Sequence, residues 1–164
     1  MAMDDENTEA VPEGFTRLPH GLGFTDNLQP CYRRVEDGEV SFGLVVGTQH
    51  GNIMGICHGG VLVTLADVTA ATGVNMARGV RAGNPTINLS VDFISAARIG
   101  QWIQAQVHSV TVKRRFGFCS GLITSSAGVV ARFNGTFYLP EHQGMVKPGA
   151  IGDGVPPQHW RQPD

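Results

Sequence analysis

The residues best suited to chemistry lie in one stretch, Gly51 to Asp67, which reads GNIMGICHGGVLVTLAD. Gly59 and Gly60 follow a histidine and precede a long apolar segment, so they stand where a helix is expected to begin. Backbone N–H groups in a first helical turn have no partner within the helix, and glycine lets a ligand atom approach them closely. We therefore expect the two glycines to form an oxyanion site that binds and polarises a carbonyl group.

Asp67 is the one ionisable side chain in the interior of the apolar helix that we predict over residues 60–78. A helix that is apolar on nearly every face is usually buried, so its solitary carboxylate needs an explanation. Two helical turns after the glycines, a carboxylate can attack a carbonyl carbon or activate a water molecule. The stretch thus carries the two groups that acyl transfer requires. The alternative is that Asp67 lies on an exposed stripe of the helix and has no chemical role.

The elements that position this stretch follow from the spacing of apolar residues. Alternation with a period of two predicts strands over residues 39–47, 87–93, 102–112, 118–124 and 129–138. The apolar phase shifts between Val107 and Val110, which predicts a β-bulge. Lys113 to Gly117 is predicted to be a charged turn. One long helix wrapped by one curved antiparallel sheet is an α+β fold.

Length and composition limit the other possibilities. The 164 residues predict one domain over 14–140, between an acidic disordered tail over 1–13 and a Gly/Pro-rich tail over 141–164. A net charge of −2 gives no reason to expect nucleic acid or a membrane as partner. Three cysteines without CxxC spacing and the lack of an apolar leader favour a cytoplasmic protein. We expect no metal and no bound cofactor, since no third ligand accompanies His50 and His58 and no nucleotide-binding motif occurs.

The order of elements, together with the pattern N-x5-H-G-G-x6-D at Asn52, His58, Gly59, Gly60 and Asp67, resembles the hotdog-fold acyl-CoA thioesterases of the phenylacetate-degradation type. The segment TINLSVDFISAARIG, residues 86–100, also resembles the strand and turn that follow the helix in that family. The likeness covers about residues 25–138, and the HGG…D segment is its specific part. It implies a hotdog fold, in which a curved antiparallel sheet wraps a central helix.

The resemblance also implies a role for single residues. The Gly59 N–H would hold the thioester oxygen, and Asp67 would be the nucleophile or general base, facing the loop of a neighbouring subunit. Asn52 would place the water or the thioester, and a hydroxyl after the helix, Thr86 or alternatively Ser90, would support the carboxylate or the water. Family members form homodimers, often paired into homotetramers, so the site would be shared between subunits. Coenzyme A would be part of the substrate rather than a cofactor.

Each of these residues also has a purely structural alternative. His58 is either a general base or a residue that holds the loop through backbone hydrogen bonds. The glycine pair fits simple helix-start geometry, Asn52 fits a turn, and Thr86 fits the start of a strand. We reject a Cys57–His58 nucleophile pair, because adjacent side chains in an extended loop point apart.

The dense basic run Lys113, Arg114 and Arg115 is either a clamp for the phosphates of coenzyme A or a solvated hairpin turn. The predicted function is hydrolysis of aryl or short- to medium-chain acyl-CoA thioesters to free acid and CoA. Two other hotdog functions remain open. A hydratase or dehydratase would need a histidine after Asp67 on the helix, and none is present. A non-catalytic dimer that binds acyl-CoA would keep the fold without turnover.

Overall fold

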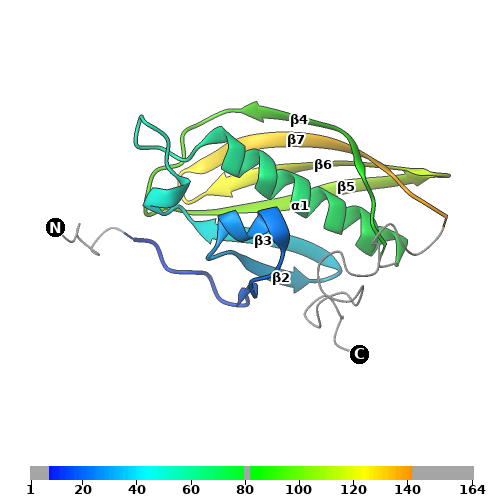
Figure 1. Cartoon of the computed structure of the whole chain (residues 1–164), viewed down its shortest axis with the longest axis horizontal. Helices are drawn as coiled ribbons and strands as arrows, with labels where there is room; N and C mark the ends of the chain where they lie inside the picture. The colour runs from blue at the N-terminus through cyan, green and yellow to red at the C-terminus, as the bar shows by residue number, and fades with distance from the viewer. Residues whose placement is uncertain (1–7, 80–81, 142–164) are drawn as a thin grey trace.

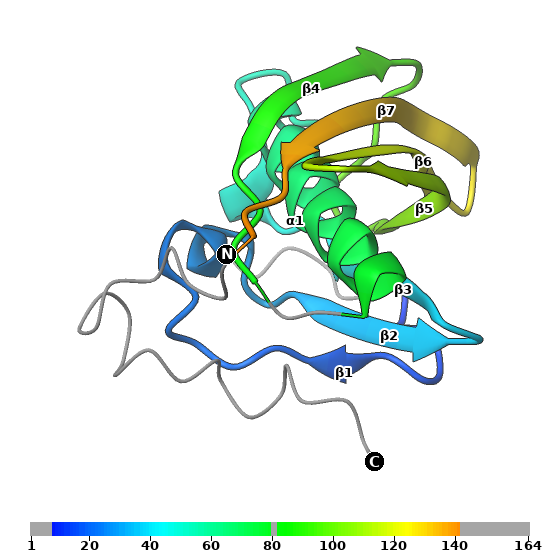
Figure 2. The same cartoon turned by 90° about the vertical axis from the view of Figure 1, so that its right-hand side faces the viewer.

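One long helix, α1, lies across the curved face of one antiparallel sheet (Figures 1 and 2). The computed structural model describes residues 8–79 and 82–141. Within this part, the sheet has seven strands in the order β1-β2-β3-β5-β6-β7-β4. The elements are β1 Thr16–Arg17, β2 Tyr32–Glu36, β3 Glu39–Val45, α1 Gly59–Arg78, β4 Thr86–Phe93, β5 Trp102–Lys113, β6 Phe116–Ser125 and β7 Gly128–Tyr138, with 3-10 turns at Gly23–Leu28 and Thr48–His50.

The core lies between α1 and the central strands. Leu65, Ala66 and Ala70 of α1 are fully buried against the inward-facing residues of the sheet, such as Ile103 and Ala105 on β5. Small residues let the helix approach closely: a Cβ atom on Gly117 would overlap Val74, which is itself fully buried. Burial of this apolar face holds the helix in one position relative to the sheet, and with it the residues of the HGG…D segment.

The predicted α+β hotdog architecture is confirmed, with differences at the ends of elements. Helix α1 begins at Gly59, one residue earlier than predicted. The bulge in β5 is present, as a register shift between Val107 and Ser109. The predicted turn over residues 113–117 is too long, because Lys113 and Phe116 pair with each other and only the two residues between them form the turn.

The chain before the first strand is attached to the domain by Glu9. Its N–H donates to the Gly100 carbonyl at 2.8 Å, and its carboxylate accepts hydrogen bonds from the Trp102 N–H at 2.9 Å and from the Ser126 hydroxyl at 2.5 Å. Glu9 therefore has defined contacts, although it lies in the segment whose composition predicted a loose tail. Residues 1–7 and, apart from Glu141, the predicted C-terminal tail lie outside the described residues.

Helix α1 has the length and composition of a membrane span, with 20 residues and a mean hydropathy of 1.3. A core helix passes the same test, and α1 packs along β3, β5 and β6. Its apolar composition is therefore explained by its place against the sheet. The outward stripe of α1, which includes Val63 and Asp67, is exposed or half-buried in the single chain.

Candidate active site

The Asp67 carboxylate is held by a hydroxyl from the start of β4. Thr86 Oγ1 donates a hydrogen bond of 2.7 Å to Asp67 Oδ1. The structure thus brings Thr86 to the carboxylate, whereas Ser90 lies four residues further along the strand, about 13 Å away. Asp67 is half-buried on α1, so the dry surroundings predicted from its apolar neighbours are wrong for the single chain.

Two asparagines that sequence reasoning missed fix the connection between α1 and Thr86. Asn84 Nδ2 donates to the carbonyl of Ala71, one turn after Asp67, at 2.8 Å. Asn75 Nδ2 donates to the Ala82 carbonyl at 2.7 Å and approaches Asn84 Oδ1 at 3.4 Å. Asparagine near the end of a helix is a signal of turn chemistry, but the sequence does not specify these partners.

Cys119 on β6 is buried and near enough to Asp67 for the charge of the carboxylate to act on its thiol. Burial raises the pKa of its thiol to about 11, and the charge of Asp67 acts in the same direction. Burial also raises the pKa of Cys57, beside His58, to about 11. Because the thiolate is the reactive form of cysteine, neither group is suited to act as the nucleophile at neutral pH.

At the start of α1, only one of the two glycines keeps its N–H open. The Gly60 N–H donates to His58 Nδ1 at 2.8 Å, so His58 is the N-cap of the helix. The Gly59 N–H meets no acceptor within residues 8–79 and 82–141. Because the Gly60 donor is occupied in the single chain, Gly59 is the better candidate for the oxyanion donor, and a binding role for Gly60 stays a prediction. The contact favours the structural alternative for His58.

A hollow of about 340 Å³ opens beside Gly59. Residues from the loop before α1, from α1 and from the end of β4 line it: Asn52, Ile56, Gly59, Leu62, Phe93 and Ile94, with Cys57 and residues 95–97. All of these side chains are uncharged. An uncharged wall beside a free N–H at the positive end of a helix suits a polarised carbonyl attached to an apolar group.

Asn52 stabilises its own loop and also lines the hollow. Its Oδ1 accepts hydrogen bonds from the backbone N–H groups of Met54 at 2.9 Å and Ile56 at 3.4 Å, as in an Asx turn. A backbone bond of 2.8 Å from the Asn52 N–H to the Ile56 carbonyl closes the same loop. Because the carbonyl oxygen is used in the turn, only the amide NH₂ of the side chain is available to a ligand.

Gly59 and Asp67 are too far apart to act on one carbonyl within a single chain. Asp67 is eight positions after Gly59, which corresponds to about 12 Å along the helix axis. A nucleophile must lie within about 3–3.5 Å of the carbon it attacks. The two halves of the predicted chemistry therefore lie at separate places on α1.

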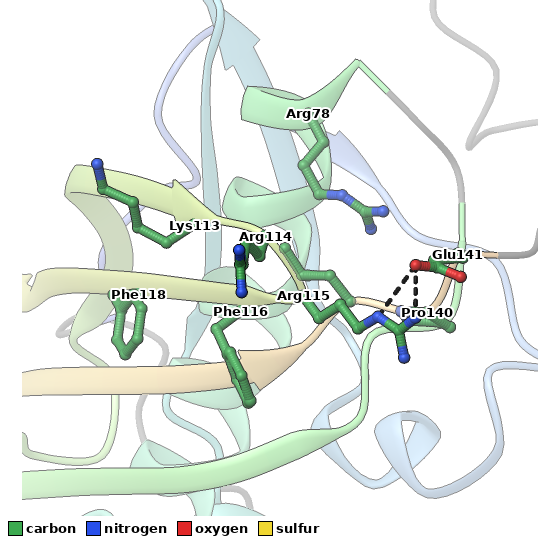
Figure 3. A pocket seen from close by; sticks show the side chains of 9 residues that line it. Arg78, Lys113, Arg114, Arg115, Phe116, Phe118, Pro140 and Glu141 are labelled. Atoms are coloured by element: carbon green, nitrogen blue, oxygen red, sulfur yellow. Dashed lines mark hydrogen bonds and ion pairs between the residues drawn. The ribbon is translucent and has the colours of Figure 1, made fainter.

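The basic run lines a second hollow, of about 850 Å³, at the opposite end of α1 from Gly59 (Figure 3). Arg115 forms an ion pair with Glu141, with Nη2–Oε1 at 2.5 Å and Nε–Oε1 at 3.1 Å, and this bond raises the pKa of Arg115. Arg78, from the last turn of α1, joins the lining. Sequence reasoning missed Arg78, because nothing in its neighbourhood along the chain points to the hairpin.

Comparisons with known proteins agree with the fold and identify the family. A family model described as the thioesterase superfamily matches residues 54–140. A Pseudomonas aeruginosa protein provisionally named an esterase, PA0474, is 32% identical over 131 residues, which cover 79% of this chain and 98% of that protein.

Solved structures of the same architecture come from distant organisms. Zebrafish thioesterase superfamily member 2 has a TM-score of 0.66 and 25% identity, covering 73% of this chain and 88% of its own. A point mutant of the phenylacetic acid degradation protein PaaI from Thermus thermophilus has a TM-score of 0.63 and 25% identity, covering 71% of this chain and 98% of its own. Family and relative together support a hydrolase of thioester bonds. The chain belongs to the thioesterase superfamily and has its hotdog fold.

Proposed function

We propose that the protein hydrolyses acyl-CoA thioesters to the free acid and coenzyme A, in a site that two copies of the chain form together. The observation that carries the proposal is the open N–H of Gly59 beside an uncharged hollow, at a distance along α1 from a carboxylate that Thr86 holds. One chain holds both groups, but at separate places on α1. A second subunit would bring its Asp67 carboxylate to the Gly59 N–H of the first.

The edge strand β4 offers a way to join two chains. It pairs with β7 on one side, and its other edge has no partner strand among the described residues. Ile87 and Phe93, near its two ends, are 54% and 57% exposed. The strand contains no proline or lysine, the residues that commonly protect an edge from pairing. These features favour antiparallel pairing of β4 with β4 of a second copy.

Such pairing, centred on the middle of β4, would bring the two halves of the site together. Phe93 would then lie beside Thr86 of the partner subunit. In each chain the Phe93 ring lies against Gly59, with its Cζ atom 3.2 Å from the place of an added Cβ. Thr86 in turn holds Asp67. The Gly59 N–H would therefore face Asp67 of the partner subunit.

The chemistry follows from this arrangement. The thioester oxygen accepts a hydrogen bond from the Gly59 N–H, whose position at the start of α1 stabilises the negative charge that develops on it. The Thr86 hydroxyl occupies Asp67 Oδ1 and leaves Oδ2 for the reaction.

Two routes use the same groups. In one, Oδ2 attacks the carbonyl carbon, the C–S bond breaks, CoA leaves as the thiolate, and water hydrolyses the mixed anhydride. In the other, the carboxylate takes a proton from water while the water oxygen attacks the carbon, and the departing thiolate is then protonated. The Asn52 NH₂ group, which lines the hollow, would orient the water or the thioester.

Release of free thiol from a panel of aryl-, short-, medium- and long-chain acyl-CoAs tests the proposal. We expect Asp67→Asn to lower kcat by about 10²-fold or more while the fold and the dimer remain intact. Asp37→Asn is the matched control, since it removes a carboxylate from an exposed hairpin far from the site. Full activity of Asp67→Asn, or no turnover of any member by the folded wild type, would overturn the proposal. Binding of acyl-CoA without thiol release would point to a non-catalytic dimer.

A further inference from the structure

We infer that the hollow at the β5–β6 hairpin binds the nucleotide end of coenzyme A, with Arg78 and Arg114 on the phosphates and Phe116 against the adenine ring. The inference rests on the proposed function and deepens it, because it assigns the enzyme to CoA thioesters rather than to thioesters of carriers that lack a nucleotide. The sequence suggested that Lys113, Arg114 and Arg115 together bind the phosphates of coenzyme A. The inference changes that set, since Arg115 is already paired with Glu141.

The charges around the hollow are unbalanced. Four cationic side chains and one carboxylate line it, and the ion pair with Glu141 uses only Arg115. Arg78 Nη1 is buried and meets no acceptor in the described part of the chain. A buried guanidinium N–H without a partner is unfavourable unless an anion or water completes it. Figure 3 shows the Arg78 side chain reaching from the end of α1 toward the Arg115–Glu141 pair, while the Lys113 ammonium points away from that pair.

Arg114 occupies a backbone position that does not favour arginine. Its φ is +50°, in the left-handed region, at the two-residue turn between β5 and β6. Glycine or asparagine is the usual choice in such a turn, because a larger side chain strains the backbone. The backbone therefore gives no reason for an arginine here, whereas a guanidinium directed at a phosphate does.

Two exposed rings stand beside these cations. Phe116 and Phe118 are 42% and 43% exposed, on the same face of β6, with ring centroids 6.5 Å apart. Tyr138 on β7 packs edge-on against Phe116 at 6.3 Å. Exposed rings next to guanidinium groups form a platform on which a purine base can stack while its phosphates meet the positive charge.

The hollow lies within reach of the catalytic carboxylate. Thr86 is opposite Phe137 on β7, and Phe137 is opposite Gly117 on β6, beside Phe116. Two strand spacings, about 10 Å, thus separate Thr86 from the edge of the platform. Phe116 points to the face of the sheet opposite to α1, since its neighbour Gly117 is buried on the covered face. The flexible pantetheine arm of a thioester held at Asp67 would therefore pass around the end of β7 to the hairpin, so that acyl group and nucleotide bind at the two ends of one extended site.

The test compares hydrolysis of one acyl group on two carriers, CoA and N-acetylcysteamine, which lacks the nucleotide. In wild type, kcat/KM should be much higher for the CoA thioester. In Arg114→Gly and in Arg78→Gln, the ratio of the two values should fall about tenfold, as expected for loss of one charge-assisted hydrogen bond. The Tm of Arg114→Gly should not fall below that of wild type, since glycine relieves the turn.

Asp37→Gly is the matched control, because it relieves the same backbone strain, at φ +51°, in the β2–β3 hairpin. It should leave the ratio of the two substrates at the wild-type value. Equal kcat/KM for both carriers in wild type, or an unchanged ratio in both arginine variants, would overturn the inference.

Calorimetric binding separates failure of this inference from failure of the proposed function. Adenosine 3′,5′-bisphosphate should bind the wild-type protein and bind Phe116→Leu more weakly, even if no thioester is hydrolysed. Inorganic pyrophosphate should bind less tightly than the bisphosphate. Equal binding of the two ligands, with no effect of Phe116→Leu, would show a general anion site and overturn the nucleotide assignment.

Discussion

His58 Nδ1 accepts the Gly60 N–H at 2.8 Å, and this one contact decides which of the two glycines can bind a substrate. The cap satisfies one of the open donors of the first helical turn and leaves the neighbouring Gly59 N–H beside the uncharged hollow. The HGG sequence thus combines a residue that fixes the start of the helix with a residue that presents a donor.

Gly59→Pro should remove the proposed oxyanion donor with little change in the backbone. Proline is favoured at the first position of a helix, and His58, with ψ of 136°, already has the extended conformation that precedes proline. We expect kcat to fall by about 10²- to 10³-fold, the usual effect of losing one oxyanion donor.

Gly59→Ala is its control, because it adds a Cβ near the exposed Phe93 ring but keeps the N–H. Steady-state kinetics of the two variants should therefore differ by at least about tenfold in kcat. Equal losses in both would mean that space at Gly59, and not its N–H, matters.

His58→Ala should lower stability more than it lowers activity. Loss of an N-cap typically costs about 1 kcal/mol, which for a chain of this size lowers Tm by about 2–4 °C. His58→Asn, which can still cap, should recover most of that stability. Thermal unfolding and kcat are measured on both variants. A loss of kcat of about 10²-fold in each, with Tm unchanged, would instead identify His58 as a general base.

Thr86→Val should lower kcat by about tenfold, since it removes the hydroxyl that fixes Asp67 Oδ1 and preserves the shape of the side chain. Thr86→Ser retains the hydroxyl and should keep most of the activity. Ser90→Ala, on the same strand, controls for a general effect on β4. If Ser90→Ala were the more damaging change, the support of the carboxylate would have to be reassigned.

His50 should make the protein less stable in mild acid. It is 1% exposed, its Nδ1 accepts the Gly47 N–H at 3.0 Å, and burial lowers its pKa, with the Leu28 and Val45 carbonyls acting in the opposite direction. The folded protein therefore prefers neutral His50, while the unfolded chain takes up a proton below about pH 6.5.

The free energy of unfolding should accordingly be constant above that pH and fall below it, until pH reaches the lowered pKa of the folded state. The contribution of His50 to the slope of the free energy of unfolding against pH is at most about 1.4 kcal/mol per pH unit. Denaturant unfolding between pH 8 and pH 5 should show a smaller slope in His50→Gln than in wild type, and the exposed His108→Gln should match wild type. Identical slopes for His50→Gln and wild type would contradict this account.

The fold was predictable, and the residues of the candidate site could be picked out, because both depend on local periodicity. Alternation over β4 to β7 and the apolar run of α1 define the elements, and the glycines and Asp67 stand out against them. Partners that meet only in three dimensions were not predictable. The His58 rotamer that occupies the Gly60 N–H, the Asn75–Asn84 contact, and the approach of Arg78 to the hairpin each depend on how distant segments pack.

The central claim is that Gly59 of one subunit and Asp67 of the other act on the same thioester, and subunit mixing tests it most directly. Gly59→Pro and Asp67→Asn chains are inactive alone, but a dimer that contains one of each has one site with both residues intact. Co-refolding equal amounts should restore about a quarter of the wild-type thiol release, because half of the dimers are mixed and one of their two sites is complete. A mixture that forms mixed dimers but stays inactive would contradict the shared site.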